Sequence, residues 1–267
     1  MSAAVSLTEA VLATLSAAEP AEKVRLTTVA AVNWRSGAIG ALGTALPPDR
    51  PARPSRPLTL PPNKMPKRRL GGMDGKIAML HALAHIELNA IDLACDMVAR
   101  FAASALPRAF FDDWITVAEE EGRHFTGLES LLRDLGSHYG ALPAHDGLWE
   151  AAQKTSDDLL ARLAIVPMTL EARALDTAPA TIARLREMGE TAIVTVLNGI
   201  LNDEIAHVAT GVRWFDHLCK AADLDPARHY QAIVRAHFTK GLKAPFNRQA
   251  RDHAGFPPAY YEPLADG

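Results

Sequence analysis

The stretch "NDEIAHVATGVRWF", residues Asn202–Phe215, places a glutamate and a histidine three residues apart inside an apolar helical stripe. Apolar residues recur at helical spacing on both sides of Glu204, from Leu197 to Phe215. Burying a carboxylate is costly unless a partner compensates its charge. The sequence therefore predicts a long helix whose buried face carries a compensated Glu204.

A second stretch, "WITVAEEEGRHF", repeats the Glu-x-x-His spacing at Glu121 and His124. Residues three apart on a helix share a face, so each pair can meet one ion. The spacing alone is a weak signal, because chance can produce one such pair in a chain with ten histidines. The apolar stripe around each pair makes the signal stronger.

Two more predicted helices each carry one glutamate on an apolar stripe, Glu87 in "AHIELNAIDLACDM" and Glu171 in "LEARALD". The order along the chain is Glu, Glu-x-x-His, Glu, Glu-x-x-His, which is a two-fold repeat of a helix pair. Four buried carboxylates would repel one another, and two divalent cations would cancel their charge. Carboxylate oxygen and imidazole nitrogen suit iron, manganese or zinc, and open positions favour iron or manganese. The expected metal ligands are Glu87, Glu121, His124, Glu171, Glu204 and His207.

An acidic residue precedes each motif glutamate. We expect these residues, Asp203 and Glu120, to orient the ligating histidines by accepting a hydrogen bond from the ring nitrogen that does not bind the metal. For His81 and His85 we predict a role in helix packing or at the surface, with a role in the metal site as the alternative. Tyr139 lies in a connection, so a tyrosyl radical beside the metals is not supported.

The remaining pattern is helical throughout, because the long segments have a 3.6-residue period and no alternating strand pattern occurs. A proline-rich arm separates two N-terminal helices from the rest, and Pro167 is expected to kink its helix. The helix after residue 154 should start near Asp157, with Thr155 or Ser156 as its N-cap. The predicted helices cover residues 8–18, 19–35, 75–104, 108–135, 148–154, 157–176, 179–188, 190–221 and 226–241, followed by a loose tail. The predicted domains are 1–74 (helices and arm), 75–222 (metal-binding bundle) and 223–267 (C-terminal helix and tail).

The bulk composition narrows the class of protein. A net charge of -3 argues against DNA and an anionic membrane as partners. The N-terminus lacks a basic region and indicates an amphipathic helix, not a signal peptide. Two isolated cysteines indicate buried thiols, and no apolar run is long enough for a membrane span. We expect a cytoplasmic protein. The basic stretch Lys64 to Arg69 is expected to be a solvated arm, with an anionic substrate or RNA contact as the alternative.

The quoted stretches, together with "HDGLWEAA", resemble the ferritin-like superfamily of di-iron carboxylate proteins. More narrowly, they resemble a bacterial family known as domain of unknown function 455, over about residues 50–245. The resemblance implies an all-α fold: a ferritin-like four-helix bundle with a long crossover, plus extra N- and C-terminal helices. "LEARALD" also resembles a segment of the tRNA-modifying di-iron hydroxylase.

The leading hypothesis is a non-haem di-iron (or Fe/Mn) protein that activates dioxygen to hydroxylate or oxidise a small-molecule or nucleoside substrate. It would need an external electron donor, such as a redox partner protein. One alternative is a ferroxidase or iron-handling ferritin-like protein, and another is a tRNA-modifying hydroxylase. The added arm and helices suggest a covered pocket or a homodimer.

Overall fold

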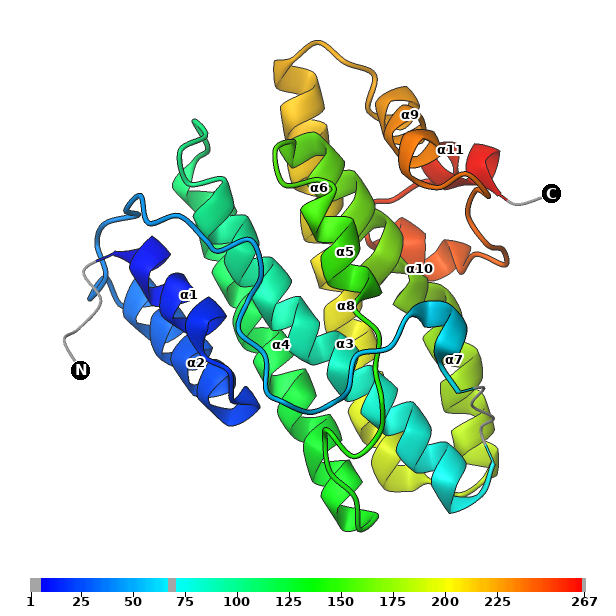
Figure 1. Ribbon diagram of the computed structural model, residues 1–267. Coiled ribbons are helices and arrows are strands. Elements are labelled where there is room, and N and C mark those ends of the chain that lie inside the picture. The colour runs from blue at the N-terminus through cyan, green and yellow to red at the C-terminus, as the bar shows by residue number, and fades with distance from the viewer. Residues whose placement is uncertain (1–5, 67–70, 266–267) are drawn as a thin grey trace. The chain divides into compact units, whose positions relative to one another are not determined.

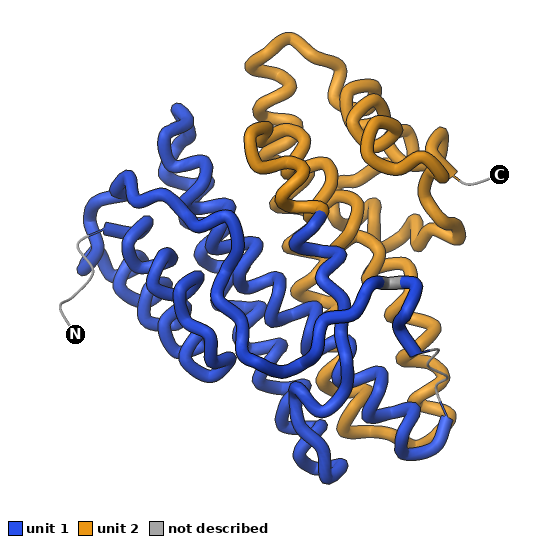
Figure 2. Tube along the Cα trace, viewed as in Figure 1, with its two compact units in different colours: residues 1–150 blue, residues 151–267 orange. Residues whose placement is uncertain are grey.

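The computed structural model describes residues 6–66 and 71–265, and it is helical in every long element. Among these residues, β pairing is limited to isolated bridges. The chain divides into two compact units, Met1–Glu150 and Ala151–Gly267 (Figure 2). The all-α expectation is therefore confirmed. The division into units does not test the predicted domain boundaries, which stay a prediction.

Unit 1 is built on two long helices that pack against each other, α3 and α4 (Figure 1). A hairpin of α1 and α2 covers them, with α1 on α3 and α2 on α4. Ser6 caps α1 by accepting a hydrogen bond from the Glu9 N–H, and Pro20 opens α2 at a position that suits proline. The elements are α1 (Leu7–Ser16), α2 (Pro20–Arg35), η1 (Pro62–Lys64), α3 (Gly72–Arg100), α4 (Arg108–Asp134) and α5 (Gly147–Gln153), whose last turn lies in unit 2.

The proline-rich arm runs over unit 1 without a helix until η1 and is held by backbone hydrogen bonds. Leu60 N donates to Ala144 O at 2.8 Å, and Ala144 N donates to Leu58 O at 3.0 Å. The indole N–H of Trp149 donates to Asp49 O at 3.1 Å. These contacts fix the arm against α5 and the connection that precedes it.

Unit 2 places α6 and α7 against α8, with α9 packed on α6. Between α6 and α7 the helix widens into a π-helical segment, η2, which contains Pro167. A π-helix thus stands where the sequence predicted a kink at Pro167, and the kink itself stays a prediction. The elements are α6 (Leu159–Ile165), η2 (Val166–Glu171), α7 (Ala172–Glu187), α8 (Thr191–Ala221), α9 (Pro226–His237), α10 (Arg248–His253), α11 (Pro258–Tyr261) and η3 (Glu262–Leu264).

One predicted helix break, at Pro179, is wrong: α7 runs through it without interruption. Proline cannot donate the helical hydrogen bond to the carbonyl four residues back, which is Leu175 O. The side chain of Asn247 donates to that carbonyl at 3.0 Å instead. A side chain from the C-terminal region therefore replaces the missing helical donor.

The C-terminal tail was expected to be loose, and this too is wrong. Arg251 is buried and donates two hydrogen bonds to Asp176, at 2.9 and 2.8 Å. Its guanidinium also lies over the rings of Phe246, Phe256 and Tyr261. The tail is an integral part of the unit 2 core.

Several helix ends differ from the prediction, and the helix expected over residues 226–241 ends at His237. The helix expected to reach residue 104 ends at Arg100, whose guanidinium is tied back to Asp96 and to Pro48 O in the arm. The N-cap of α6 is Asp158, which accepts from Ala161 N at 3.0 Å. Thr155 instead bonds the carbonyls of the preceding helix and accepts from Arg162.

One helix of the described residues, α3, is long and apolar enough to cross a membrane by length and composition. Most of its apolar window, 61%, is buried inside the protein. It also carries buried Glu87, Asp92 and Asp96. Both cysteines are buried thiols, as expected.

Candidate metal centre

The unit 1 cluster consists of Glu87 on α3 and Glu121 and His124 on α4. The three residues are buried, with exposed fractions of 4%, 0% and 5%. The Nδ1 atom of His124 lies 3.3 Å from Glu87 Oε2 and 3.3 Å from Glu121 Oε2. One ligand atom from each residue lies within 4.8 Å of those of the others, so the cluster could hold a metal ion. The structure thus brings together the predicted ligands of the first helix pair.

Packing of α3 on α4 explains why the cluster forms. Small residues flank Glu87 on its buried face, including Ala84 and Ala90, so the two helices approach closely. On α4, Ala118 and Phe125 are buried on the stripe that carries the motif. The apolar stripe that buries each helix carries its ligand candidates inward with it.

The electrostatics of the cluster call for a positive partner. Burial raises the pKa of the Glu87 carboxyl, and the nearby charge of Glu121 adds to this, so that it reaches about 8. Burial would lower the pKa of His124, but the contacts with Glu121 and Glu87 outweigh burial and raise it to about 11. Protons therefore neutralise part of this cluster at neutral pH, and a metal ion would take over that role by displacing them.

The unit 2 set consists of Glu204 and His207 on α8 and Glu171 at the end of η2. Glu204 and His207 are buried, with 5% and 1% exposed, and His207 Nδ1 lies 3.9 Å from Glu204 Oε1. Glu171 is half-buried. The motif residues of α8 are therefore buried, as the stripe on α8 predicts.

The position of Glu171 depends on the π-helix that precedes it. A Cβ added at Gly211 of α8 would lie 2.8 Å from the ring of Pro167, so only glycine allows this approach. The Thr169 hydroxyl donates to Ala164 O, five residues back, at 2.8 Å and contacts the Tyr230 hydroxyl at 2.8 Å. π-Helical turns are frequent at functional sites. Sequence patterns predicted neither the Gly211 contact nor Tyr230.

The structure settles part of the remaining sequence predictions. Glu120 accepts from Arg123 of the same helix at 3.1 Å, and Asp203 is half-buried. Their proposed roles beside the histidines stay predictions. Trp114 and Trp214 are buried core residues. Of the basic stretch Lys64 to Arg69, residues 67–69 lie outside the described residues.

The two extra histidines of α3 make structural contacts, as predicted. Buried His81 accepts at Nε2 from Gly140 N at 2.9 Å. His85 Nδ1 lies 2.8 Å from the Tyr139 hydroxyl, and its Nε2 lies 3.1 Å from His145 O. Burial lowers the pKa of His85 to about 4, assisted by the charge of Arg53. The imidazole is therefore neutral at neutral pH.

A buried ionic network in unit 1 was missed at the sequence level. Lys23 Nζ lies 2.6 Å from Asp92 Oδ1, and both side chains are fully buried. Arg53 from the arm reaches Asp92 Oδ2 at 3.0 Å and donates to Asn89 Oδ1 at 2.5 Å. Asp92 stands within the apolar run "AIDLACDM". An acidic residue in such a run was a signal for a buried cationic partner.

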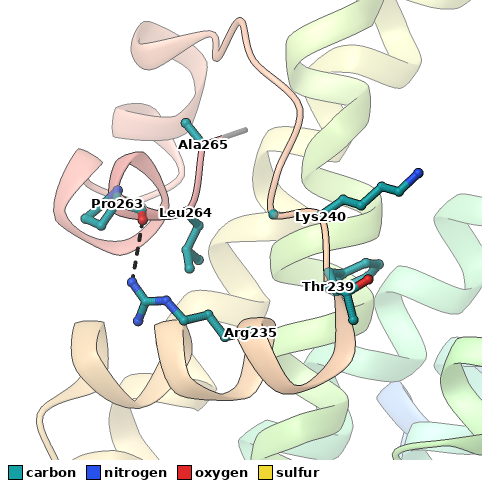
Figure 3. Close-up of a pocket in the computed structure, with 8 residues that line it drawn as sticks. Arg235, Thr239, Lys240, Pro263, Leu264 and Ala265 are labelled. Atoms are coloured by element: carbon teal, nitrogen blue, oxygen red, sulfur yellow. Dashed lines mark hydrogen bonds between the residues drawn. The ribbon is translucent and has the colours of Figure 1, made fainter. Parts of the chain in front are cut away.

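Unit 2 contains a cavity of about 370 Å³ between the end of α9 and the C-terminal residues. Arg235 Nη2 donates to Pro263 O at 3.5 Å across it (Figure 3). Its described lining has no carboxylate, imidazole or thiol, so it does not resemble a metal site. The lining residues are Arg235, Phe238, Thr239, Lys240, Gly241, Pro263, Leu264 and Ala265.

Comparison with known proteins identifies a relative and a family for this chain. An "Uncharacterized protein" of Haemophilus influenzae is 40% identical over 205 residues, which cover 75% of this chain and 71% of the relative. No solved structure matches the chain. The family model described as "Protein of unknown function (DUF455)" matches residues 16–262. The chain therefore belongs to the DUF455 family.

Proposed function

We propose that the protein is a dimetal carboxylate protein of ferritin-like architecture that activates dioxygen to hydroxylate or oxidise a substrate. In this proposal the unit 1 cluster and the unit 2 set are the ligands of two iron ions. Manganese in place of one iron is the alternative composition.

The observation that carries the proposal is the unit 1 cluster. Two carboxylates and an imidazole, all buried, have ligand atoms within 4.8 Å of one another. This donor set fits iron or manganese, which accept oxygen and nitrogen ligands without a thiolate. The equivalent residue types on α8 and at the end of η2 support a second set, because the chain repeats the same order of ligand types.

Ferrous iron held by these ligands would supply the reduction of dioxygen. Hydroxylation inserts one oxygen atom into a substrate C–H bond and releases the other as water, and it takes up two electrons and two protons. An external donor must provide the electrons, since the chain offers no motif for a flavin or nicotinamide. The protein contributes the carboxylate geometry and the exclusion of water, because every member of the unit 1 cluster is buried.

Iron titration of the anaerobically purified protein tests the proposal. We expect two ferrous ions per chain, and new near-ultraviolet absorption when oxygen is added. Oxygen consumption with a chemical reductant should continue beyond the first turnover. A chain that binds no iron would contradict the proposal. Many irons per chain in a large shell by size-exclusion chromatography would favour iron storage instead.

The substrate class is tested separately. Modified tRNA nucleosides are compared between a knockout strain and the wild type. A hydroxylated nucleoside that is missing from the knockout would assign a nucleoside substrate. An unchanged profile would direct the search to small molecules. Neither result alters the metal test.

A further inference from the structure

We propose that unit 1 contains a binding pocket for a small anion, bearing a phosphate or a carboxylate group, under the proline-rich arm. The pocket has a volume of about 260 Å³. It is lined by Arg50, Arg53, Pro54, Pro57 and Thr59 of the arm, by His85 of α3, and by Tyr139 and Asp146 of the connection after α4. The inference does not rest on the proposed function.

The charge around the pocket leaves a positive excess. Arg50 forms an ion pair with Asp146, which balances both groups. Next to the pocket, Lys23 and Arg53 both pair with the single carboxylate of Asp92. One positive charge is therefore uncompensated, and Arg53 is the member that lines the pocket, with 26% of its side chain exposed. A guanidinium at the mouth of a concave site favours an anion.

Contacts with the protein hold the two terminal nitrogens of the Arg53 guanidinium, while part of the side chain stays exposed. Its Nη2 donates to Asn89. Its Nη1 is itself buried and pairs with Asp92 Oδ2 at 3.0 Å, so this nitrogen faces the protein and not the pocket. A guanidinium carries five N–H donors in a planar fork, which matches the oxygens of a carboxylate or phosphate. The Asn89 and Asp92 contacts hold that fork in place before any ligand arrives.

The remaining walls suit a compact ligand. Pro54 and Pro57 give rigid apolar surface, and their fixed backbone lowers the entropy lost on ordering the arm. Tyr139 is held by its hydroxyl contact with His85 and by ring contacts with His81 and Phe125. The pocket is smaller than typical sites for drug-sized ligands, so the ligand has few atoms beyond its charged group.

The pocket opens on a different side of α3 from the unit 1 cluster. His85 and Glu87 are two positions apart, and such residues point to opposite faces of a helix. The pocket is therefore a separate binding site and not a part of the carboxylate cluster. Its ligand would bridge the arm and α3, and so stabilise the arm in place.

The test measures thermal stability of the full chain in inorganic phosphate, and separately in acetate, against chloride at matched ionic strength. We expect a saturable rise in Tm with at least one of the two anions, because a ligand that binds only the folded state stabilises it. Arg53→Gln should abolish the saturable rise. The matched control is Arg56→Gln, which removes an exposed arginine of the same arm and should keep it.

A second variant guards against misfolding of Arg53→Gln. Thr59→Trp fills the pocket while leaving the Arg53, Asp92 and Lys23 contacts intact, and it should weaken anion binding at least tenfold by calorimetry. A response to phosphate alone, or to acetate alone, would support the pocket and identify the anionic group. No saturable response to either anion, or an equal response in wild type and Thr59→Trp, would overturn the proposal.

Discussion

The same Glu-x-x-His motif stands in two different settings in the two units. In unit 1, His124 is in contact with both Glu121 of its own helix and Glu87 of the neighbouring helix, at 3.3 Å each. In unit 2, His207 lies 3.9 Å from Glu204 of its own helix. Glu87, the ligand candidate of unit 1 outside the motif, lies on a regular α-helix, whereas its counterpart in unit 2, Glu171, ends a π-helix. Repetition in sequence has thus produced similar ligand types on differently built supports.

The comparison shows that different interactions position the carboxylate-bearing helices in the two units. In unit 1 a buried ionic network, Lys23 with Asp92 and Arg53, fastens α2 and the arm to α3. In unit 2 close contact at Gly211 and the Tyr230 hydroxyl bond shape the π-helix before Glu171. We therefore expect unit 1 to respond most to loss of charge and unit 2 most to added volume.

Replacing one motif glutamate in each unit should have the largest effect, on metal content. In Glu204→Ala we expect the loss of at least one of two ions, with one retained by the three ligands of unit 1. Glu121→Ala leaves unit 1 with one carboxylate and one imidazole, so retention there should be poorer still. Metal analysis after gel filtration measures both.

Matched controls for these variants are Asp134→Asn on α4 and Asn202→Ala on α8, which change exposed side chains of the same helices. Both should bind metal as the wild type does. A Glu204→Ala protein that binds both ions normally would show that our ligand assignment is wrong.

Lys23→Met should cost unit 1 about 3–5 kcal/mol of unfolding free energy. The substitution removes the Lys23 ammonium from the fully buried Asp92, which keeps its ion pair with Arg53, and breaking one side of a buried pair is strongly destabilising. Urea denaturation provides the measurement. The double variant Lys23→Met/Asp92→Leu should recover much of the loss, whereas a loss below about 1 kcal/mol in the single variant would refute the importance of the network.

Added volume should instead affect unit 2. Gly211→Ala places a methyl group 2.8 Å from the Pro167 ring, and such overpacking costs about 1–3 kcal/mol. Gly199→Ala, on the same helix with open space around it, should stabilise by about 0.5–1 kcal/mol. In unit 1, Gly122→Ala meets Val24 only at 3.6 Å and should be tolerated. Equal unfolding free energies for Gly211→Ala and Gly199→Ala would remove the argument for a glycine-dependent π-helix.

Helical class and the inward direction of the motif residues were predictable, because an apolar stripe with a 3.6-residue period fixes which face is buried. Glu87, Glu121 and His124 came together as a local consequence of two neighbouring helices packing on those stripes. The burial of Glu204 and His207 followed from the stripe on α8 in the same way.

Features that depend on distant partners were not predictable. Pro179 stays within a helix because Asn247, far along the chain, supplies the donor that proline lacks. The tail is ordered because Arg251 finds Asp176. The ligand-bearing architecture as a ferritin-like bundle and the identity of the metal remain predictions, since neither follows from the contacts within one unit.

The pKa values of two histidines of unit 1 are shifted in opposite directions, so they should change the free energy of unfolding with pH in opposite directions. The effect of His85 is the smaller one. Its pKa is lowered to about 4 in the folded protein, against about 6.5 when unfolded. As the pH falls below about 6.5 the unfolded chain takes up the proton first, so stability is lost between about pH 6.5 and pH 4. His124, whose pKa is raised, contributes no such loss in that range. Because His85 is partly exposed, we expect the difference between pH 7 and pH 5 to be on the order of 1 kcal/mol. Urea denaturation at the two pH values should show this extra acid sensitivity in wild type and not in His85→Gln; equal sensitivity in both proteins would show that His85 does not titrate as its surroundings predict.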